Sequence, residues 1–254
     1  MAAPSTLDLG AGRRLAYHSM PGKWDGKHAP GVVFLGGFRS DMTGTKALHL
    51  EAWAAATGRA FLRFDYRGHG ASSGTFEEGC IGDWADDARE AVSRLTEGPQ
   101  VLVGSSMGGW IALLLARVMP ERVAALVGIA AAPDFTEDSM WAAFGEAERR
   151  TLETEGQVAL PSDYSDEPYV VTRRLIEDGR ERLVLRSPLA LPFPVRLLHG
   201  TADADVPVER GLLLLSHMDC PDARLTLVKD ADHRFSGSAE LDLITSTIET
   251  LPLG

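Results

Sequence analysis

Cysteine is scarce in this 254-residue sequence, which contains only Cys80 and Cys220. The two lie far apart and lack the paired spacing of a zinc site or a redox motif, so we expect free thiols, with a bridge between them left open. Three signatures of cofactor or metal chemistry are also missing: H-E-x-x-H, the phosphate-binding P-loop and the dinucleotide pattern G-x-G-x-x-G. We therefore predict neither a cofactor nor a bound metal.

Long apolar runs and an excess of positive charge are missing as well. No apolar run approaches the roughly 20 residues that span a bilayer, and the first residues show no secretory signal. The chain has 25 basic and 36 acidic residues, a formal net charge of -11. Such a surface repels nucleic acid and anionic lipid. We expect a cytoplasmic protein with no nucleic-acid partner and no membrane span, and its oligomeric state stays open.

What the sequence does contain is an alternation of short apolar runs and longer amphipathic stretches. Runs that are apolar on both faces are typical of central strands in a covered parallel sheet. They occur at 32–35, 60–64, 101–103, 123–130, 195–198 and 225–228. Helices are predicted at 43–57, 83–97 and 107–119, and a leading antiparallel hairpin at 6–9 and 13–18. The pattern predicts an α/β fold, a mostly parallel central sheet flanked by helices, in a single domain over 1–254.

Residues 134–190 interrupt this alternation. They carry no strand signal and read as helices at 139–154 and 167–178, with prolines as breaks. We expect a helical lid inserted over the sheet within the same domain. Several of its apolar side chains are candidates to line a substrate pocket, and ordinary packing onto the sheet explains each of them at least as well. They are Met140, Trp141, Phe144, Val170, Val171, Leu175 and Ile176.

Residues 104–108 (GSSMG) fit the pattern G-x-S-x-G between a predicted strand and a predicted helix. Such a sharp turn strains the backbone of the central serine and projects its hydroxyl above the sheet. A chance Gly/Ser-rich turn is the alternative, and the strand–turn–helix setting argues against it. We predict that Ser106 is a nucleophile. The neighbouring Ser105 lacks the flanking-glycine register and is expected to face the core.

A serine nucleophile needs a histidine base that a carboxylate orients. In the fold that carries this turn the chain order is serine, then acid, then histidine. This order excludes four of the seven histidines: His18, His28, His49 and His69. His199 precedes the loop expected to hold the acid, and His217 lies on a predicted surface helix. His233 follows the last predicted strand, and we predict that it is the base.

The acid is expected in the loop after the preceding strand. Asp203 lies three residues after Gly200 and three before Val206, the register usual for this position. We predict that Asp203 is the acid. Asp205 and Asp232 remain alternatives for the acid. Helix capping and solvation of a loop would explain these two residues without a catalytic role.

Backbone N–H groups are expected to stabilise the negative charge that develops during attack on a carbonyl. One donor is the N–H of Met107, at the start of the helix after the nucleophile. The second is expected in the loop after an early strand, where the sequence reads Gly36-Gly37-Phe38. We predict the N–H groups of Phe38 and Met107 as the oxyanion hole. A Gly-Gly pair also occurs in ordinary tight turns, so this prediction depends on the position of the pair directly after an early strand.

Several segments together resemble one known group. They are residues 36–47 (GGFRSDMTGTKA), 63–70 (RFDYRGHG), 98–110 (GPQVLVGSSMGGW), 196–200 (RLLHG) and 232–234 (DHR). The sequence resembles the α/β-hydrolase group that contains the mitochondrial palmitoyl-protein thioesterases, also described as mycophenolic acid acyl-glucuronide esterases. The resemblance spans about residue 31 to the C-terminus and is weakest in the lid.

The resemblance implies the α/β-hydrolase fold and hydrolysis of acyl esters or thioesters by Ser106, Asp203 and His233. The substrate is then a small molecule or an S-acylated one. No mitochondrial presequence is visible, so we expect a bacterial relative. Arg39 replaces an apolar residue of that group and is expected to favour an anionic group on the substrate. Two other functions stay open: a prolyl-oligopeptidase-like peptidase, and a small-ligand sensor with little turnover.

Overall fold

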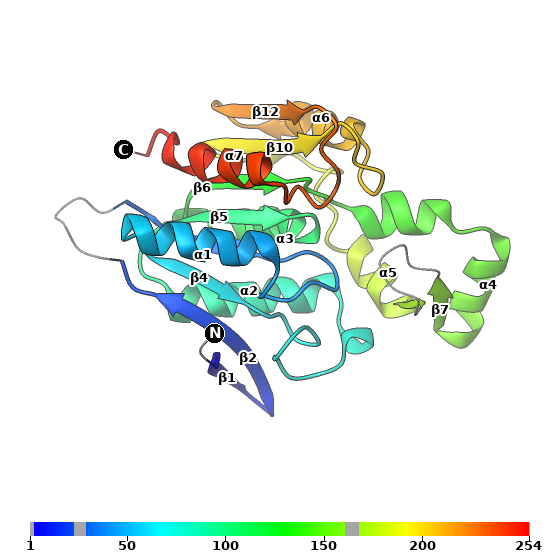
Figure 1. Cartoon of the computed structure of the whole chain (residues 1–254). Helices are drawn as coiled ribbons and strands as arrows, with labels where there is room; N and C mark the ends of the chain where they lie inside the picture. Colours follow the sequence, from blue (N-terminus) through cyan, green and yellow to red (C-terminus); the bar gives the residue numbers. More distant parts are fainter. Residues whose placement is uncertain (1–2, 23–28, 161–167, 254) are drawn as a thin grey trace.

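The computed structural model describes residues 3–22, 29–160 and 168–253, and an eight-stranded sheet runs through their centre (Figure 1). Its strands, in spatial order, are β1 (Ser5–Gly10), β2 (Arg13–Met20), β4 (Phe61–Phe64), β3 (Gly31–Leu35), β5 (Gln100–Ser105), β6 (Val123–Ile129), β10 (Val195–Gly200) and β12 (Ala223–Val228). β2 pairs antiparallel with β1 and with β4, and every other pair is parallel. The predicted mostly parallel sheet and its leading hairpin are confirmed.

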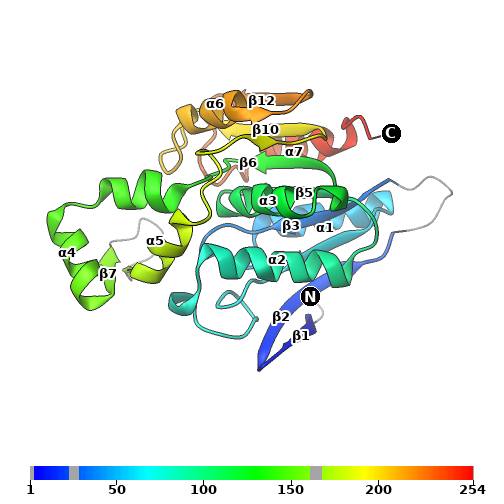
Figure 2. The ribbon, with the colours of Figure 1, turned by 180° about the vertical axis from the view of Figure 1, so that it is seen from behind.

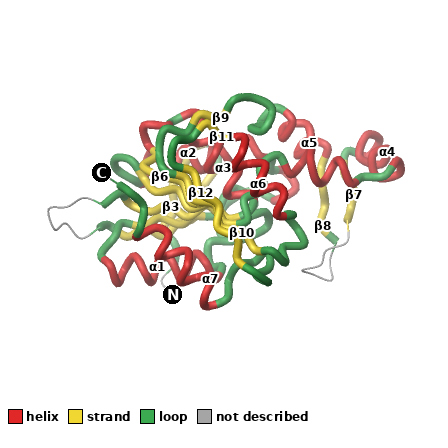
Figure 3. Tube along the Cα trace, turned by 90° about the horizontal axis from the view of Figure 1, so that it is seen from above, coloured by secondary structure: helices red, strands yellow, loops and turns green. Residues whose placement is uncertain are grey.

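Helices cover both faces of the sheet (Figure 3). One face carries α1 (Thr45–Thr57) and α7 (Ser238–Glu249), and the other carries α2 (Ile81–Leu95), α3 (Met107–Val118) and α6 (Val208–His217). Successive side chains of a strand point to opposite faces. In β5, Val101 and Val103 therefore pack in the cluster with α1 and α7, whereas Leu102 packs in the cluster with α2 and α3. Burial on both faces explains the continuous apolar runs of the central strands.

Several shorter elements connect the strands and helices of the sheet. They are the 3₁₀ helices η1 (Phe76–Glu78) and η2 (Pro120–Arg122) and the two-residue strands β9 (Leu189–Ala190) and β11 (Met218–Asp219). Cys80 is buried and Cys220 is half-buried, and both are free thiols, as predicted. Among the helices of the described residues, none combines the length and apolar character needed to cross a membrane.

Residues 183–190 run back beside the C-terminal ends of α3 and α6, but residues 136–160 and 168–180 lie beyond the carboxyl ends of the parallel strands (Figure 2). Their elements are the π-helix η3 (Thr136–Trp141), α4 (Glu146–Glu155), β7 (Gln157–Leu160), β8 (Tyr169–Thr172) and α5 (Arg173–Arg180). β7 and β8 form a separate antiparallel pair. The prediction of a segment without strands is therefore wrong, because α4 ends at a left-handed Gly156 and the chain turns directly into β7.

The predicted helix boundaries in this segment also differ from the structure. The helix expected at 139–154 is interrupted at Gly145, whose extended backbone (φ -73°, ψ 178°) separates η3 from α4. The helix expected at 167–178 begins only at Arg173. The residues before it, Tyr169–Thr172, are aromatic and β-branched, which favours a strand. Pro161, one of the prolines expected to break the helices, and Glu167, the expected start of the second helix, lie outside the described residues.

A buried carboxylate holds the start of this segment. Asp134 is fully buried with a backbone φ of 60°, and its two oxygens accept hydrogen bonds from the N–H groups of Val184 (2.8 Å) and Leu185 (2.9 Å). Arg186 lies 3.5 Å from the same carboxylate. Because an unpaired buried N–H is costly, these bonds join the two ends of residues 134–190 where they leave and rejoin the sheet.

Candidate active site

The turn around Ser106 has the strained backbone that the motif predicts. β5 ends at Ser105 and α3 begins at Met107, and Ser106 between them has φ 54° and ψ -116°. Its N–H donates to the carbonyl of Ile129 (2.9 Å), and its own carbonyl accepts from Gly109 (2.9 Å) and Ala132 (3.1 Å). A non-glycine residue persists in such a conformation only where its surroundings hold it. These bonds hold the Ser106 hydroxyl at the carboxyl edge of the sheet.

Glycine at position 108 is required by the close approach of two backbone segments. A side-chain carbon at Gly108 would lie 2.0 Å from the Leu35 carbonyl oxygen and 2.7 Å from that of Gly36. We expect Gly108→Ala to lower the free energy of unfolding by about 3 kcal/mol, because backbone atoms on both sides must move. At Gly44 the nearest atom is 3.6 Å away and φ is -60°.

Urea denaturation of Gly108→Ala and of the control Gly44→Ala checks this expectation. The control variant should stay within about 1 kcal/mol of the wild type. Equal stability of the two variants would show that the turn tolerates a side chain at position 108.

Ser106, His233 and Asp203 form one hydrogen-bonded line. His233 Nε2 lies 3.1 Å from Ser106 Oγ, and His233 Nδ1 lies 2.9 Å from Asp203 Oδ2. Asp203 follows β10 and His233 follows β12, so two adjacent parallel strands deliver both residues to the edge where β5 ends. In this arrangement the Nδ1–H donates to the carboxylate, which leaves Nε2 free to accept the hydroxyl proton of Ser106. The structure thus brings together all three predicted residues.

The surroundings of Asp203 favour its charged form. Burial raises the pKa of this carboxyl, but the hydrogen bond from His233 and the one from the Val206 N–H (2.8 Å) outweigh burial, and the charges of His233 and His199 act in the same direction. The net pKa lies below the ordinary value of 3.8. Asp203 therefore stays a carboxylate throughout the neutral range and can stabilise a protonated His233.

The competing candidates have other partners. His199 is buried, and its Nε2 lies 2.7 Å from the Val206 carbonyl and 3.5 Å from Asp203 Oδ2. His217 Nε2 lies 2.8 Å from the Ser187 carbonyl. Neither ring is hydrogen-bonded to Ser106. The carboxylate of Asp232 accepts from the N–H of Phe235 in its own loop.

The predicted oxyanion donors lie on the two segments that flank Ser106. Neither the N–H of Phe38 nor that of Met107 donates to another described residue. A side-chain carbon at Gly37 would lie 3.5 Å from Ser106 Cβ, so the loop passes close to the nucleophile. The Phe38 ring packs edge-on against Phe76 at 4.8 Å between centroids, which anchors the loop to an aromatic cluster beside α2. These two N–H groups have no described partner and remain candidates for binding an oxyanion.

Arg39 and the apolar side chains of residues 134–190 take mainly packing positions. The guanidinium of Arg39 lies over the ring of Phe76, 5.2 Å from its centroid. Four of the seven proposed pocket residues are buried within the main apolar cluster: Phe144, Val171, Leu175 and Ile176. For these four residues the structure supports the packing interpretation.

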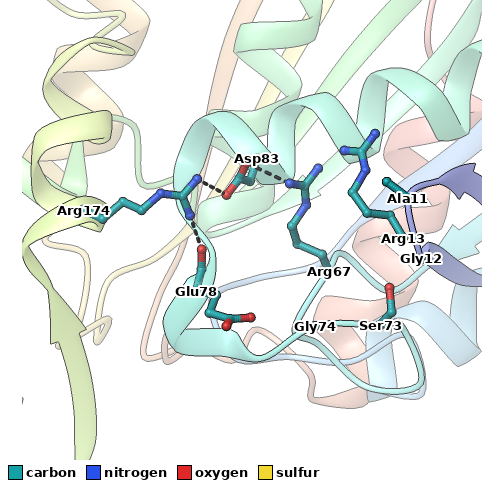
Figure 4. Close-up of a pocket in the computed structure, with 9 residues that line it drawn as sticks. All are labelled: Ala11, Gly12, Arg13, Arg67, Ser73, Gly74, Glu78, Asp83 and Arg174. Atoms are coloured by element: carbon teal, nitrogen blue, oxygen red, sulfur yellow. Dashed lines mark hydrogen bonds and ion pairs between the residues drawn. The ribbon is translucent and has the colours of Figure 1, made fainter.

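A cavity of about 350 Å³ opens where the β1–β2 turn, η1 and α2 meet α5 (Figure 4). Its walls contain none of the predicted site residues. Asp83, on α2, pairs with Arg67 (2.8 Å) and with Arg174 of α5 (2.7 Å), and Arg174 also donates to the Glu78 carbonyl. These contacts anchor α5 to the sheet domain. The cavity is therefore a structural junction rather than the centre of the predicted chemistry.

A second cavity, of about 180 Å³, lies directly beside the Gly36-Gly37 loop. Its walls include Ser105, Lys46 and Arg234. The sequence interpretation gave no role to Lys46 or Arg234, and it expected Ser105 to face the core. The position of Ser105 could have been found from the alternation of side chains along β5, which places Ser105 on the same face of the sheet as Val101 and Val103.

Comparisons with known proteins show the family of the chain. The sequence pattern of the Alpha/beta hydrolase family matches residues 32–242. The chain is 39% identical over 238 residues to the mouse protein named palmitoyl-protein thioesterase ABHD10, mitochondrial. The aligned region covers 93% of this chain and 78% of the mouse protein. The human protein of the same name is 37% identical, with 93% and 76% covered.

Solved structures show the same architecture. A hydrolase from Agrobacterium vitis S4 superposes with a TM-score of 0.91 at 41% identity, covering 97% of this chain and 96% of that one. The mouse alpha/beta hydrolase domain-containing protein 10 superposes with a TM-score of 0.88 at 37% identity, covering 98% and 97%. The expected fold and the resemblance to the thioesterase group are both confirmed. The chain belongs to the alpha/beta hydrolase family.

Proposed function

We propose that this protein hydrolyses acyl esters or thioesters, with Ser106 as the nucleophile, His233 as the general base and Asp203 as the orienting acid. One observation carries the proposal: His233 lies between Ser106 and Asp203 in a continuous hydrogen-bonded line. One ring nitrogen faces the Ser106 hydroxyl, which a strained backbone turn holds in place, and the other faces the Asp203 carboxylate. Nucleophilic catalysis by serine requires this combination.

The geometry supports acyl transfer in two steps. His233 Nε2 accepts the proton of Ser106 as Oγ attacks the carbonyl carbon, and the N–H groups of Phe38 and Met107 donate to the resulting oxyanion. His233 then gives that proton to the leaving alcohol or thiol as the acyl-enzyme forms. Water, deprotonated by His233, releases the acid and restores Ser106. One oxyanion donor typically contributes on the order of 3 kcal/mol to the transition state.

The substrate class rests on the relatives. The mouse and human proteins that the chain resembles are named palmitoyl-protein thioesterases. From these names we infer that the substrate carries an acyl group on oxygen or sulfur, and that it is a small molecule or an S-acylated one. Residues 134–190 act in this proposal as a lid within one domain over 1–254, since their described elements from η3 to α5 lie beyond the strand ends where Ser106 is held. A cytoplasmic location stays a prediction, and the curated relatives are named as mitochondrial.

A substrate panel tests the proposal against its two rivals. The panel contains p-nitrophenyl esters and S-acyl N-acetylcysteamine thioesters of several chain lengths, together with aminoacyl-proline p-nitroanilides. We expect turnover of esters and thioesters and none of the anilides. Turnover confined to the anilides would favour the peptidase, and saturable binding with almost no turnover of any substrate would favour the sensor.

Asp203, Asp205 and His233 also place three ligand atoms within 4.8 Å of one another, close enough to hold a cation. A metal there would compete for the Asp203 oxygen and the His233 nitrogen that the proposed triad uses. We therefore expect kcat/KM to be unchanged, within about twofold, after dialysis against EDTA, and unchanged again after Zn²⁺ or Mn²⁺ is added. Loss of activity on dialysis with recovery on metal addition would contradict the proposed roles of Asp203 and His233.

A further inference from the structure

The cavity of about 180 Å³ beside the Gly36-Gly37 loop is lined by polar groups. It lies between the carboxyl ends of β3 and β5, the first turn of α1 and the loop that carries His233. We call it the rear hollow. The polar side chains that matter here are Ser40, Lys46, Ser105, Arg234 and Ser236.

Three hydroxyl groups of the rear hollow make no hydrogen bond to a described residue. Ser105 is 94% buried, at 6% exposure, yet its hydroxyl makes no hydrogen bond to any described residue. The hydroxyls of Ser40 and Ser236 likewise have no described partner. No side chain caps α1, because its N-cap is Gly44, so the first N–H groups of this 13-residue helix face the same space. The unpaired hydroxyl of a buried residue that lines the hollow, together with a bare helix start, favours a bound acceptor of hydrogen bonds.

The charges around the rear hollow favour an anion as that acceptor. Lys46 and Arg234 both line it, and Lys46 Nζ donates to the Arg234 carbonyl. Burial is the main reason that the pKa of Lys46 is lowered to about 8. The negative charge of Asp232 raises this pKa, and the positive charge of Arg234 lowers it further. Asp41 is the acidic group in the wall, and one of its oxygens already accepts two hydrogen bonds from Thr43. A bound anion would stabilise the charged Lys46 and use the start of α1.

The rear hollow adjoins the reacting atoms on the side of the general base. A side-chain carbon at Gly37 would lie 3.5 Å from Ser40 Oγ and 3.5 Å from Ser106 Cβ, so a single glycine separates the hollow from the nucleophile. Arg234 directly follows His233, whose Nε2 must reach the leaving atom to protonate it. The aromatic cluster around Phe38 lies on the α2 side of the oxyanion loop, and the hollow lies on the α1 side.

We propose that the rear hollow binds a carboxylate or phosphate carried by the leaving group of the substrate, with Lys46, Arg234, the Ser105 hydroxyl and the first turn of α1 as the binding groups. This inference rests on the proposed ester or thioester hydrolysis. We infer that the preferred substrates have an anionic leaving group. The acyl chain then lies on the α2 side of the oxyanion loop, opposite the rear hollow. Charge-assisted hydrogen bonds are the strong ones in proteins, so removal of one should be measurable.

Two matched thioesters test the proposal: S-octanoyl-3-mercaptopropanoate, which has a carboxylate, and S-octanoyl-3-mercaptopropionamide, which is neutral and nearly the same shape. We expect the ratio of their kcat/KM values to favour the carboxylate in the wild type, mainly through KM. Lys46→Met should lower this ratio on the order of tenfold, and Ser105→Ala should lower it about threefold. Comparing ratios between variants removes the intrinsic reactivity difference of the two thioesters.

Arg89→Met is the matched charge control, because Arg89 lies on α2 on the opposite face of the sheet and is half exposed. It should leave the ratio as in the wild type. A ratio that does not change in Lys46→Met and Ser105→Ala would overturn the proposal, even if both thioesters are hydrolysed rapidly. An equal fall in Arg89→Met would show a long-range charge effect and would also overturn it.

A binding measurement separates this inference from the proposed function. Calorimetric titration of Ser106→Ala with the same two thioesters gives dissociation constants without turnover. We expect the carboxylate to bind more tightly than the amide in Ser106→Ala, and to lose that advantage when Lys46→Met is added. If the wild type hydrolyses neither thioester, the proposed function fails while this comparison still decides the site. Equal affinities, or no binding of either compound, would overturn the rear hollow as an anion site.

Discussion

Ser106→Ala should lower kcat for p-nitrophenyl octanoate by about a millionfold, the scale of loss seen when a serine nucleophile is removed. The variant keeps His233 and Asp203 in place but has no atom that can form the acyl-enzyme. Residual hydrolysis above the uncatalysed rate would come from binding and from the Phe38 and Met107 N–H groups. Steady-state release of p-nitrophenolate, measured with freshly purified protein, checks the result.

The matched control for this variant is Ser246→Ala on α7. The Ser246 hydroxyl donates only to the carbonyl of Leu243 within its own helix, so its loss should leave kcat within about twofold. A Ser106→Ala enzyme that retains more than about a thousandth of the wild-type kcat would contradict the assignment of the nucleophile.

Asp203→Asn should lower kcat by about ten-thousandfold while the fold is preserved. The asparagine oxygen can still accept from the Val206 N–H (2.8 Å), so the loop geometry is kept. Its NH₂ group then faces His233 Nδ1 and makes that nitrogen an acceptor. The ring proton moves to Nε2, which can no longer accept the proton of Ser106. The loss should appear in kcat with little change in KM.

Asp205→Asn provides the comparison for Asp203→Asn, since both residues lie in the same loop. The Asp205 N–H donates to Asp203 Oδ1 at 3.0 Å, and this backbone bond is retained in the variant. We expect a loss of less than about tenfold. A larger loss in Asp205→Asn than in Asp203→Asn would reverse the assignment of the acid.

The Ser106 turn could be predicted from sequence because its requirements are local. Two flanking glycines, a preceding apolar run and a following helix are all visible in residues 101–119, and the structure adds the backbone conformation of Ser106 at φ 54°. Asp203 and His233 could be predicted because parallel strands place their carboxyl ends at one edge, so chain order translates into position. The distances that join these residues depend on sheet register, which the sequence does not display.

The errors lie where local signals are weak. β7 and β8 have four residues each and pair only with one another, so neither shows the long apolar pattern of a central strand. The rear hollow was missed for another reason. Alternation could have placed Ser105 on the α1 face, but only tertiary packing brings Lys46 from α1 and Arg234 from a distant loop to the same space.

Mapping of a covalent adduct by tandem mass spectrometry tests the central claim most directly. The wild-type protein is treated with a fluorophosphonate, digested and fragmented, so that adjacent Ser105 and Ser106 are distinguished. We predict a single phosphonylated residue, Ser106, and a greatly slowed reaction in Asp203→Asn, because His233 then cannot accept the hydroxyl proton. An adduct on Ser105 or on any other residue, with Ser106 unmodified, would contradict the account.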